Sequence, residues 1–228
     1  MLIRRQVEKH LLRLKKQYPV ITITGPRQSG KTTLAKLCFP RYFYSTLEDL
    51  DTRQEAQNDP RGFLEKSPHM IIDEIQKVPS LVSYIQGITD KSKKTGQFIL
   101  TGSHHFQLTA TISQSLAGRT ALIHLLPFSM KELKSKEDYT QLLYRGFYPR
   151  IIDKKLKPKE ALSFYINTYI QRDLRDIKEI KNLKQFERFL KLSASFTGQI
   201  VNKVKFANDI GVDSKTIDSW LSILEASY

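Results

Sequence analysis

Residues 20–33 read VITITGPRQSGKTT, and this stretch decides the fold. Its first five residues, Val20–Thr24, are all β-branched and predict a strand. The next segment, Gly25–Thr32, has two glycines separated by four residues, followed by a lysine and a threonine. Thr33–Leu37 then predicts a helix. In this order, backbone N–H groups of the loop converge on a phosphate, which the N-terminal end of the helix also attracts. The stretch therefore predicts a phosphate-binding loop.

Two side chains of this loop contribute chemistry of their own. Lys31 is expected to reach the β- and γ-phosphates of a nucleotide, and the Thr32 hydroxyl to hold Mg²⁺. We therefore expect ATP and Mg²⁺ as cofactors, although no motif reads the purine ring and the choice between ATP and GTP stays open. The expected nucleotide-binding residues are Gly25, Pro26, Arg27, Gln28, Ser29, Gly30, Lys31, Thr32 and Thr33.

A pair of carboxylates follows a second apolar run. His69–Asp73 predicts a buried strand that ends in Asp73, and Glu74 comes next. Asp73 is expected to hold Mg²⁺ through its water shell. Glu74 is expected to polarise a water for attack on the γ-phosphate, which favours hydrolysis over nucleotide holding alone. The alternative is that two acidic residues merely follow a strand into a loop.

A further strand is expected over Gln97–Thr101, before Gly102-Ser103. If this strand is inserted between the loop strand and the Asp73 strand, it brings a polar residue beside the γ-phosphate. Ser103 or Thr101 would sense the phosphate there, and we assign Ser103 to the nucleotide site. The alternative is a strand that simply ends in a turn.

Arg119 comes directly before the strand predicted over Ala121–Leu125. An arginine at this place is a candidate catalytic residue that stabilises the γ-phosphate of its own site or of a neighbour's site. A surface or sheet-capping arginine explains the residue equally well.

The remaining pattern predicts an α/β fold followed by helices. Strands alternate with helical stretches up to Pro127, which is typical of a parallel sheet covered on both faces. Residues 2–17 predict an amphipathic helix, and Phe43–Thr46 predicts another strand. Beyond Pro127 the sequence predicts helices within residues 129–143 and 159–177, and then three short helices at about 184–196, 203–210 and 214–226.

The last two of these helices resemble a helix-turn-helix, with Gly211 in the turn and Asp213 as the N-cap of the second helix. On DNA, Ser214, Lys215 and Thr216 would meet base edges. The low net charge of residues 184–228 favours a structural or protein-binding role instead, and both alternatives stay open. Arg172 and Arg175, in a charge-dense helix end, are explained by pairing on a solvated face or by contact with a nucleotide or an adjoining subunit.

The composition of the 228 residues limits the class of protein. A 40% hydrophobic fraction supports a folded core. The net charge of +14 is spread along the chain and indicates at most diffuse attraction to polyanions. The single cysteine, Cys38, excludes an intramolecular disulfide and fits a reducing compartment. With no apolar stretch typical of a membrane span or secretory signal, we expect a cytoplasmic protein without a membrane partner.

At these residues the sequence resembles the AAA-type P-loop ATPases of bacteria and archaea that carry a C-terminal domain of unknown function. The resemblance runs from Pro19 to the end, through ITGPRQSGKTTLAK, IIDEIQKVP, FILTGSHHF, SQSLAGRTALIHLLPFS and the helix-turn-helix segment. It implies a P-loop core of the additional-strand type followed by a smaller all-α, winged-helix-like segment. It also implies a Walker A role for Gly25–Thr32 and a Walker B role for Asp73 and Glu74.

We expect four parts. The apolar period predicts an N-terminal amphipathic helix, packed on the core, at 1–18. The resemblance suggests the ATPase core at 19–130, a helical linker at 131–183, and an incomplete winged-helix-like segment at 184–228. Compared with that group the chain looks truncated, because further winged-helix strands and a nuclease-like domain usually follow. We therefore expect apolar residues such as Trp220 and Leu224 to be under-covered.

The sequence thus predicts a Mg²⁺-dependent ATPase in which hydrolysis moves the C-terminal helical segment. Glu74, Lys31 and Arg119 are the expected catalytic residues, and Thr32 and Asp73 the metal site. One alternative is a nucleotide-regulated DNA-binding switch with little turnover, and another is an ATP-binding fragment without activity. A protein partner or self-association is compatible with both.

Overall fold

The computed structural model describes residues 3–102, 115–135, 137–169, 180 and 182–227. The chain divides into two compact units, residues 1–155 and residues 156–228, which we describe separately. The boundary between the units lies inside the segment 131–183 that the sequence suggested as a linker.

The first unit is built on a parallel five-stranded sheet in the order β2-β3-β4-β1-β5. The strands are β1 (Val20–Thr24), β2 (Phe43–Thr46), β3 (Met70–Asp73), β4 (Phe98–Thr101) and β5 (Thr120–His124). Val20 is opposite Phe98 on one side and Thr120 on the other, which fixes the register of the central strands. The expected insertion of the Gln97–Thr101 strand between the loop strand and the Asp73 strand is therefore confirmed.

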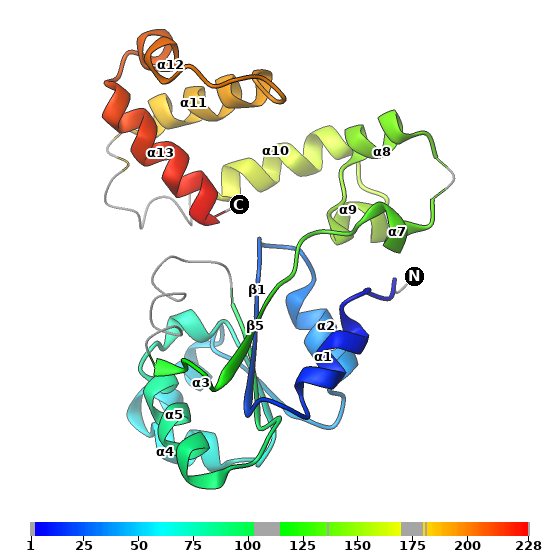
Figure 1. The fold of residues 1–228 in the computed structure, drawn as a ribbon, viewed down its shortest axis with the longest axis vertical. Coiled ribbons are helices and arrows are strands. Elements are labelled where there is room, and N and C mark those ends of the chain that lie inside the picture. Colours follow the sequence, from blue (N-terminus) through cyan, green and yellow to red (C-terminus); the bar gives the residue numbers. More distant parts are fainter. Residues whose placement is uncertain (1–2, 103–114, 136, 170–179, 181, 228) are drawn as a thin grey trace. The chain divides into compact units, whose positions relative to one another are not determined.

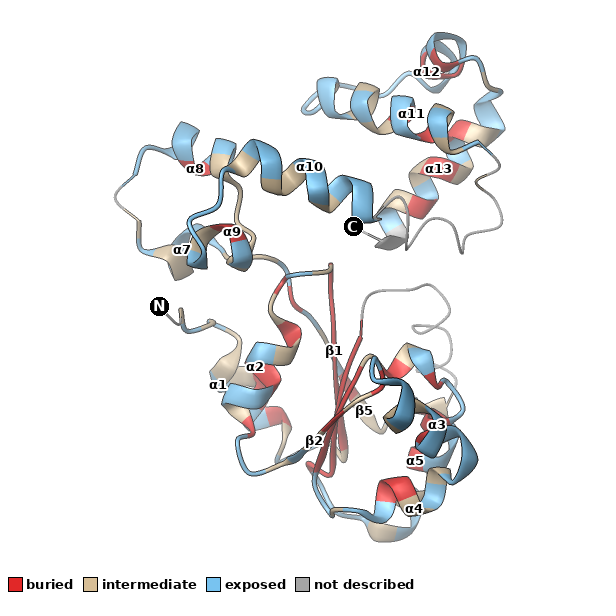
Figure 2. Cartoon of the chain, turned by 180° about the vertical axis from the view of Figure 1, so that it is seen from behind, coloured by how far each residue is buried: buried red, intermediate tan, exposed pale blue. Residues whose placement is uncertain are grey.

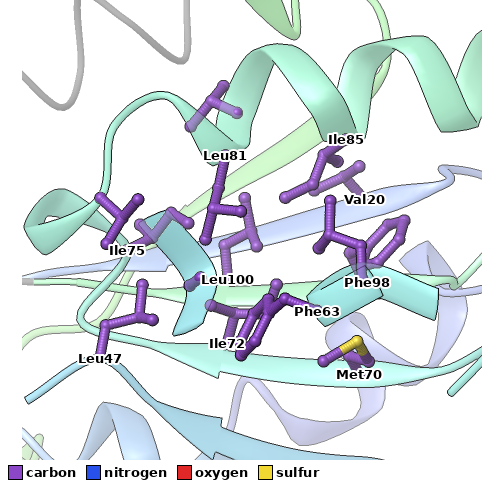
Figure 3. Close-up of a cluster of buried hydrophobic side chains, with 14 of the residues drawn as sticks. Val20, Leu47, Phe63, Met70, Ile72, Ile75, Leu81, Ile85, Phe98 and Leu100 are labelled. Atoms are coloured by element: carbon purple, nitrogen blue, oxygen red, sulfur yellow. The ribbon is translucent and has the colours of Figure 1, made fainter. Parts of the chain in front are cut away.

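Helices cover both faces of this sheet, as the near-continuous apolar strands require. The three strands β1, β3 and β4 are buried along their whole length, and Figure 2 shows red along the middle of the sheet. One face packs against α3 (Leu50–Asn58), α4 (Pro60–Glu65) and α5 (Leu81–Ser92). Figure 3 shows this core, in which Leu81 and Ile85 of α5 meet side chains of the strands such as Val20 and Leu100.

The opposite face packs against α1 (Glu8–Leu14) and α2 (Lys31–Cys38). Leu11 and Leu14 of α1 and Leu34 of α2 share a buried cluster with Ile21 and Ile99. The helix expected over residues 2–17 is too long at both ends, because α1 spans Glu8–Leu14. The Glu8 carboxylate accepts a hydrogen bond from the Arg5 backbone N–H at 2.7 Å, and residues 3–7 are not helical.

Two helices, α3 and α4, have no counterpart in the sequence-based prediction. Asp49 and Asp59 cap them, accepting hydrogen bonds from the N–H groups of Thr52 and Gly62 at 2.9 Å each. A short 3₁₀ turn, η1 (Ile75–Lys77), follows β3. After β5 come three short helices of the first unit, α7 (Met130–Leu133), α8 (Tyr139–Arg145) and α9 (Pro149–Asp153), which Figure 1 shows in green.

The second unit is helical, with α10 (Pro158–Tyr169), α11 (Leu183–Ser195), α12 (Lys203–Ile210) and α13 (Ser214–Ser227). The bounds of the last three helices agree with the sequence prediction to within one residue at each end. The turn between α12 and α13 is as expected: Gly211 is left-handed at φ 81°, and Asp213 accepts a hydrogen bond from the Thr216 N–H at 2.7 Å.

The core of the second unit corrects one expectation about coverage. Trp220 is only 2% exposed and packs edge-on against Phe186 at 5.2 Å between ring centroids. Leu224 is partly buried against the same cluster. The expectation that both are under-covered is therefore wrong, because α11 supplies a pair of phenylalanines, Phe186 and Phe189, that close over the tryptophan.

None of the helices in the described part of the chain combines the length and apolar character that a membrane crossing requires.

Candidate functional site

The loop Gly25–Gly30 connects the carboxyl end of β1 to the N-terminus of α2, as predicted (Figure 1). Gly30 is the N-cap of α2 and is left-handed, with φ 92°. Lys31, the first residue of the helix, is 7% exposed. Its ammonium donates hydrogen bonds to the carbonyl oxygens of Gly25 at 3.0 Å and Pro26 at 2.8 Å. The loop therefore closes around the lysine, and Nζ lies within it.

Gly25 is required by both its conformation and its surroundings. Its φ is +143°, in the region that favours glycine, and a Cβ would lie 2.2 Å from the Leu125 carbonyl oxygen. The backbone of Leu125, which directly follows β5, therefore lies against the first residue of the loop.

Gly25→Ala is expected to lower the free energy of unfolding by about 3 kcal/mol or more, because the strained backbone and the contact with the Leu125 carbonyl both oppose a methyl group. Gly87→Ala is the matched control, because Gly87 lies inside α5 with nothing within 4 Å of its ideal Cβ. This change is expected to raise the free energy of unfolding by about 0.5–1 kcal/mol. Urea unfolding measures both, and equal effects would contradict the steric argument.

The carboxylate of Asp73, at the end of β3, accepts hydrogen bonds from three hydroxyl groups. Thr32 Oγ1 is 3.0 Å from each carboxylate oxygen. The Tyr44 hydroxyl donates to Oδ2 at 3.0 Å, and Thr101 donates to Oδ1. Burial, followed by the charge of Asp73, raises the pKa of Tyr44 to about 12, so its hydroxyl keeps its proton at neutral pH.

These residues fit a hydrated Mg²⁺ ion and a phosphate. Carboxylate and hydroxyl oxygens are the ligands Mg²⁺ takes, and a threonine that donates its hydrogen to Asp73 still has lone pairs for the ion. In the loop, the Ser29 hydroxyl is buried without a hydrogen-bond partner. An orphaned buried donor in a phosphate-binding loop is explained by an absent anionic partner.

Glu74 follows Asp73 in a left-handed conformation, with φ 59°. Its Oε2 accepts a hydrogen bond from the amide of Gln76, which lies in η1. The sequence does not single out Gln76, because an amide two residues after a carboxylate forms no recognisable pattern. The structure therefore places Glu74 directly after Asp73 at the carboxyl end of β3, with its side chain held by Gln76.

Arg119 is not at this end of the sheet. Its backbone carbonyl accepts a hydrogen bond from the N–H of Val20, the first residue of β1, whereas the phosphate loop follows the last residue. The Arg119 guanidinium pairs with Asp90 of α5 through two hydrogen bonds. The structure therefore gives no support to contact between Arg119 and the phosphate loop of its own chain.

Three other predicted residues lie outside the described part of the chain. These are Ser103, assigned to the nucleotide site, and Arg172 and Arg175. The alternative sensing residue, Thr101, is described and fully buried, and its hydroxyl contacts Asp73.

A cavity of about 450 Å³ adjoins the phosphate loop. Gln28 and Gly30 of the loop line it, together with Thr33 of α2. The rest of the lining is Ile3, Arg5, Leu34, Leu37, Phe128, Pro149, Arg150, Asp153 and Lys154. The cavity thus combines aliphatic and aromatic walls with polar groups, and its volume is in the range of small-molecule sites.

Arg5 joins the N-terminal segment to the loop and to α7. Its side chain is 8% exposed and donates to the Ser29 carbonyl at 2.9 Å and to the Leu126 carbonyl at 2.6 Å. It also forms an ion pair with Glu132 of α7, at 3.0 Å from Nε to Oε1, and stacks over Phe128. Arg5 lies within the stretch 2–17 that predicted an amphipathic helix, and only the tertiary structure shows it in a buried network.

The Glu132 carboxylate in turn accepts hydrogen bonds from the backbone N–H groups of Gln6 and Ser129, at 2.8 Å each. Burial by itself would raise the pKa of Glu132, but these hydrogen bonds and the Arg5 guanidinium lower it below the ordinary 4.5. The charged form is therefore the one that the fold stabilises.

Glu132→Gln is expected to cost about 1–3 kcal/mol of unfolding free energy at neutral pH. A carboxyl whose pKa is lower in the folded state stabilises the fold above its unfolded pKa, and this stability is lost as the pH falls through the folded value. The difference between wild type and variant is therefore expected to shrink below pH 4.5. Urea unfolding at several pH values tests this, with the exposed Glu65→Gln as control; a difference independent of pH would contradict it.

Comparisons with known proteins agree with this architecture. A family model described as "AAA domain" matches residues 17–134, and one described as "Domain of unknown function (DUF8612)" matches residues 136–228. Uncharacterized proteins of Mycobacterium bovis and Mycobacterium tuberculosis are each 29% identical over 97% of the chain. The chain spans 51% of their length, about half.

Among solved structures, the Walker-type ATPase paby2304 of Pyrococcus abyssi is similar in fold, with a TM-score of 0.60 at 13% identity. The similarity covers 99% of this chain and 90% of that protein.

Proposed function

Because the chain belongs to the AAA domain family of P-loop ATPases, we propose that it binds ATP with Mg²⁺ and hydrolyses it to ADP and phosphate. The observation that carries this proposal is the contact between Thr32 and both oxygens of Asp73, beside the buried Lys31. A hydroxyl, a carboxylate and an ammonium group at one loop are the set that a nucleoside triphosphate and its metal require.

The residues divide the work as follows. The N–H groups of the loop Gly25–Thr33 and the start of α2 bind the phosphates. Lys31 exchanges the carbonyl oxygens of Gly25 and Pro26 for oxygens of the β- and γ-phosphates. Thr32 and Asp73 hold Mg²⁺, which when bound offsets negative charge on the phosphate oxygens.

Glu74 is the proposed general base. Held by Gln76, it orients a water toward the γ-phosphorus and takes a proton from it. A bond forms from the water oxygen to the γ-phosphorus, and the bond from that phosphorus to the β–γ bridging oxygen breaks. The bridging oxygen leaves with ADP, and the other product is inorganic phosphate.

The cavity beside the loop is the proposed site for the base and ribose. It shares Gln28, Gly30 and Thr33 with the phosphate site, and Leu34, Leu37 and Phe128 offer apolar surface to a flat ring.

Arg119, which lies at the other end of the sheet, would act only on a neighbouring molecule's site. The network of Arg5 and Glu132 connects the loop to α7. Through this connection nucleotide binding would move the helical segment that follows α7 in the chain.

Steady-state hydrolysis of ATP with Mg²⁺ tests the proposal. Asp73→Asn is expected to reduce the rate by about 100-fold or more, because the metal site loses its charge. Glu65→Gln, which changes an exposed carboxylate of α4, is the control and is expected to retain the wild-type rate. Turnover that survives Asp73→Asn or removal of the metal by EDTA would refute the proposal.

A second candidate, DNA-regulated turnover, is favoured by the pair α12 and α13, joined by the turn 211–213 with Ser214 and Lys215 exposed at the start of α13. The same assay with duplex DNA separates the two functions. Stimulation that is lost in Lys215→Ala would support DNA contact, and an unchanged rate would favour a structural or protein-binding role for these helices.

A further inference from the structure

Tyr44 is a side chain at the metal site that no catalytic motif includes. It lies on the edge strand β2, and its hydroxyl donates to Asp73 Oδ2 at 3.0 Å. The ammonium of Lys36, on α2, is 3.4 Å from the centre of the tyrosine ring. The ring is therefore held by α2 on its face, while its hydroxyl reaches the carboxylate of the neighbouring strand.

The three hydroxyl groups do not contact the two carboxylate oxygens of Asp73 equally. Thr101 contacts only Oδ1, and Thr32 is equidistant from both oxygens. Tyr44 contacts only Oδ2. Because Thr32 has one hydroxyl hydrogen for both oxygens, Tyr44 is, of these three groups, the donor directed at Oδ2 alone. Without Tyr44, Oδ2 keeps only its share of the Thr32 hydrogen bond, and the carboxylate is less restrained against rotation.

We propose that Tyr44 is a positioning residue for metal binding, which holds the Asp73 carboxylate in the orientation that Mg²⁺ requires. This rests on the proposed binding of ATP with Mg²⁺, and it assigns Tyr44 no contact with the nucleotide. A hydrogen bond to a charged acceptor is stronger than one between neutral groups, so loss of the Tyr44 hydroxyl removes a strong restraint on the carboxylate. Restricting a ligand before the metal arrives reduces the ordering that binding must supply.

Tyr42 provides a matched control two residues away. Its ring is also half-buried, and an ammonium, that of Lys15, lies 5.0 Å from its centre. Its hydroxyl also donates a hydrogen bond, to the Gly96 carbonyl at 2.5 Å. Burial raises the pKa of Tyr42 to about 12, the same value as for Tyr44. The Tyr42 ring also packs against Phe39 and His69. The two tyrosines therefore share partial burial, a nearby ammonium and a donated hydrogen bond, but only the acceptor of Tyr44 belongs to the metal site.

The experiment compares Tyr44→Phe with Tyr42→Phe in the full chain. Mn²⁺ replaces Mg²⁺ as the probe, and its binding in the presence of ATP is measured by electron paramagnetic resonance. Binding of a fluorescent ATP analogue in EDTA reports the phosphate loop without metal, and thermal unfolding reports the fold. Tyr44→Phe is expected to weaken Mn²⁺ binding by about 10-fold and to leave metal-free nucleotide affinity unchanged. Tyr42→Phe is expected to leave both affinities unchanged.

Equal Mn²⁺ affinity in wild type and Tyr44→Phe would overturn the proposal, while a loss of Mn²⁺ in Asp73→Asn would show that the proposed function still stands. No ATP-dependent Mn²⁺ binding in wild type would overturn both. Tyr44→Leu, which removes the ring as well, separates the hydroxyl from packing: a metal defect seen in Tyr44→Leu and absent from Tyr44→Phe would assign the effect to the ring and overturn the positioning role.

Discussion

Lys31→Ala is expected to weaken ATP binding by about 100-fold or more and to abolish turnover with it. The ammonium is held inside the loop by two carbonyl oxygens, so its charge is directed at the place where the loop binds phosphate. Charge-assisted hydrogen bonds are among the strongest in proteins, and a buried one is little screened by salt.

The measurement is titration with a fluorescent ATP analogue, followed by steady-state hydrolysis. Lys31→Ala leaves the Gly25 and Pro26 carbonyls without this donor, so we also expect a small loss of stability, about 1–3 kcal/mol. Lys31→Met keeps most of the buried stem and separates this loss from the loss of charge. The exposed Lys16→Ala is the control for net charge. ATP affinity within threefold of wild type in Lys31→Met would contradict the assigned role.

Glu74→Gln is expected to reduce the rate of hydrolysis by about 100- to 10,000-fold, the usual contribution of a general base. ATP affinity is expected to stay near the wild-type value, since the amide has nearly the same shape and Lys31, Thr32 and Asp73 are intact. The variant should therefore hold ATP without turning it over. Single-turnover hydrolysis and nucleotide titration on the same sample measure the two quantities.

Gln76→Leu extends this test, because it removes the donor that orients Glu74 without removing the base. We expect a smaller loss of rate, about 5- to 10-fold, with ATP affinity unchanged. Glu65→Gln, an exposed change on α4, is the control. A Glu74→Gln variant that hydrolyses ATP at the wild-type rate would exclude Glu74 as the base. A loss of rate that is fully explained by a loss of ATP affinity would indicate a binding role instead.

Much of the fold could be predicted from residues close together in the sequence. The β-branched run Val20–Thr24 forms β1, and the glycines of the loop have the left-handed conformations that such a turn needs. The turn between α12 and α13 follows from Gly211 and Asp213 in the same way. These signals are local, since each depends on the backbone preferences or capping of a few neighbouring residues.

The helices α3 and α4 could not be predicted because their sequences contain few apolar residues at helical spacing. Leu50–Asn58 has one buried residue, Ala56, and its capping aspartate resembles any acidic loop residue. The start of α1 also differs from the prediction, since Leu2, Ile3 and Val7 continue the apolar period of Leu11 and Leu14. The buried contacts of the Arg5 guanidinium with distant residues hold this segment out of the helix, and a local sequence pattern contains no information on such contacts.

By itself, then, the sequence determined the phosphate loop, the carboxylates Asp73 and Glu74, and the alternation of strands and helices that places them at one end of a sheet. Only the tertiary structure decided which distant side chains join them. Tyr44 meets Asp73 across 29 positions, and Arg5 meets Glu132 across 127. Such contacts depend on strand order and on burial, because a polar group withdrawn from water must find whatever partner the packing brings to it.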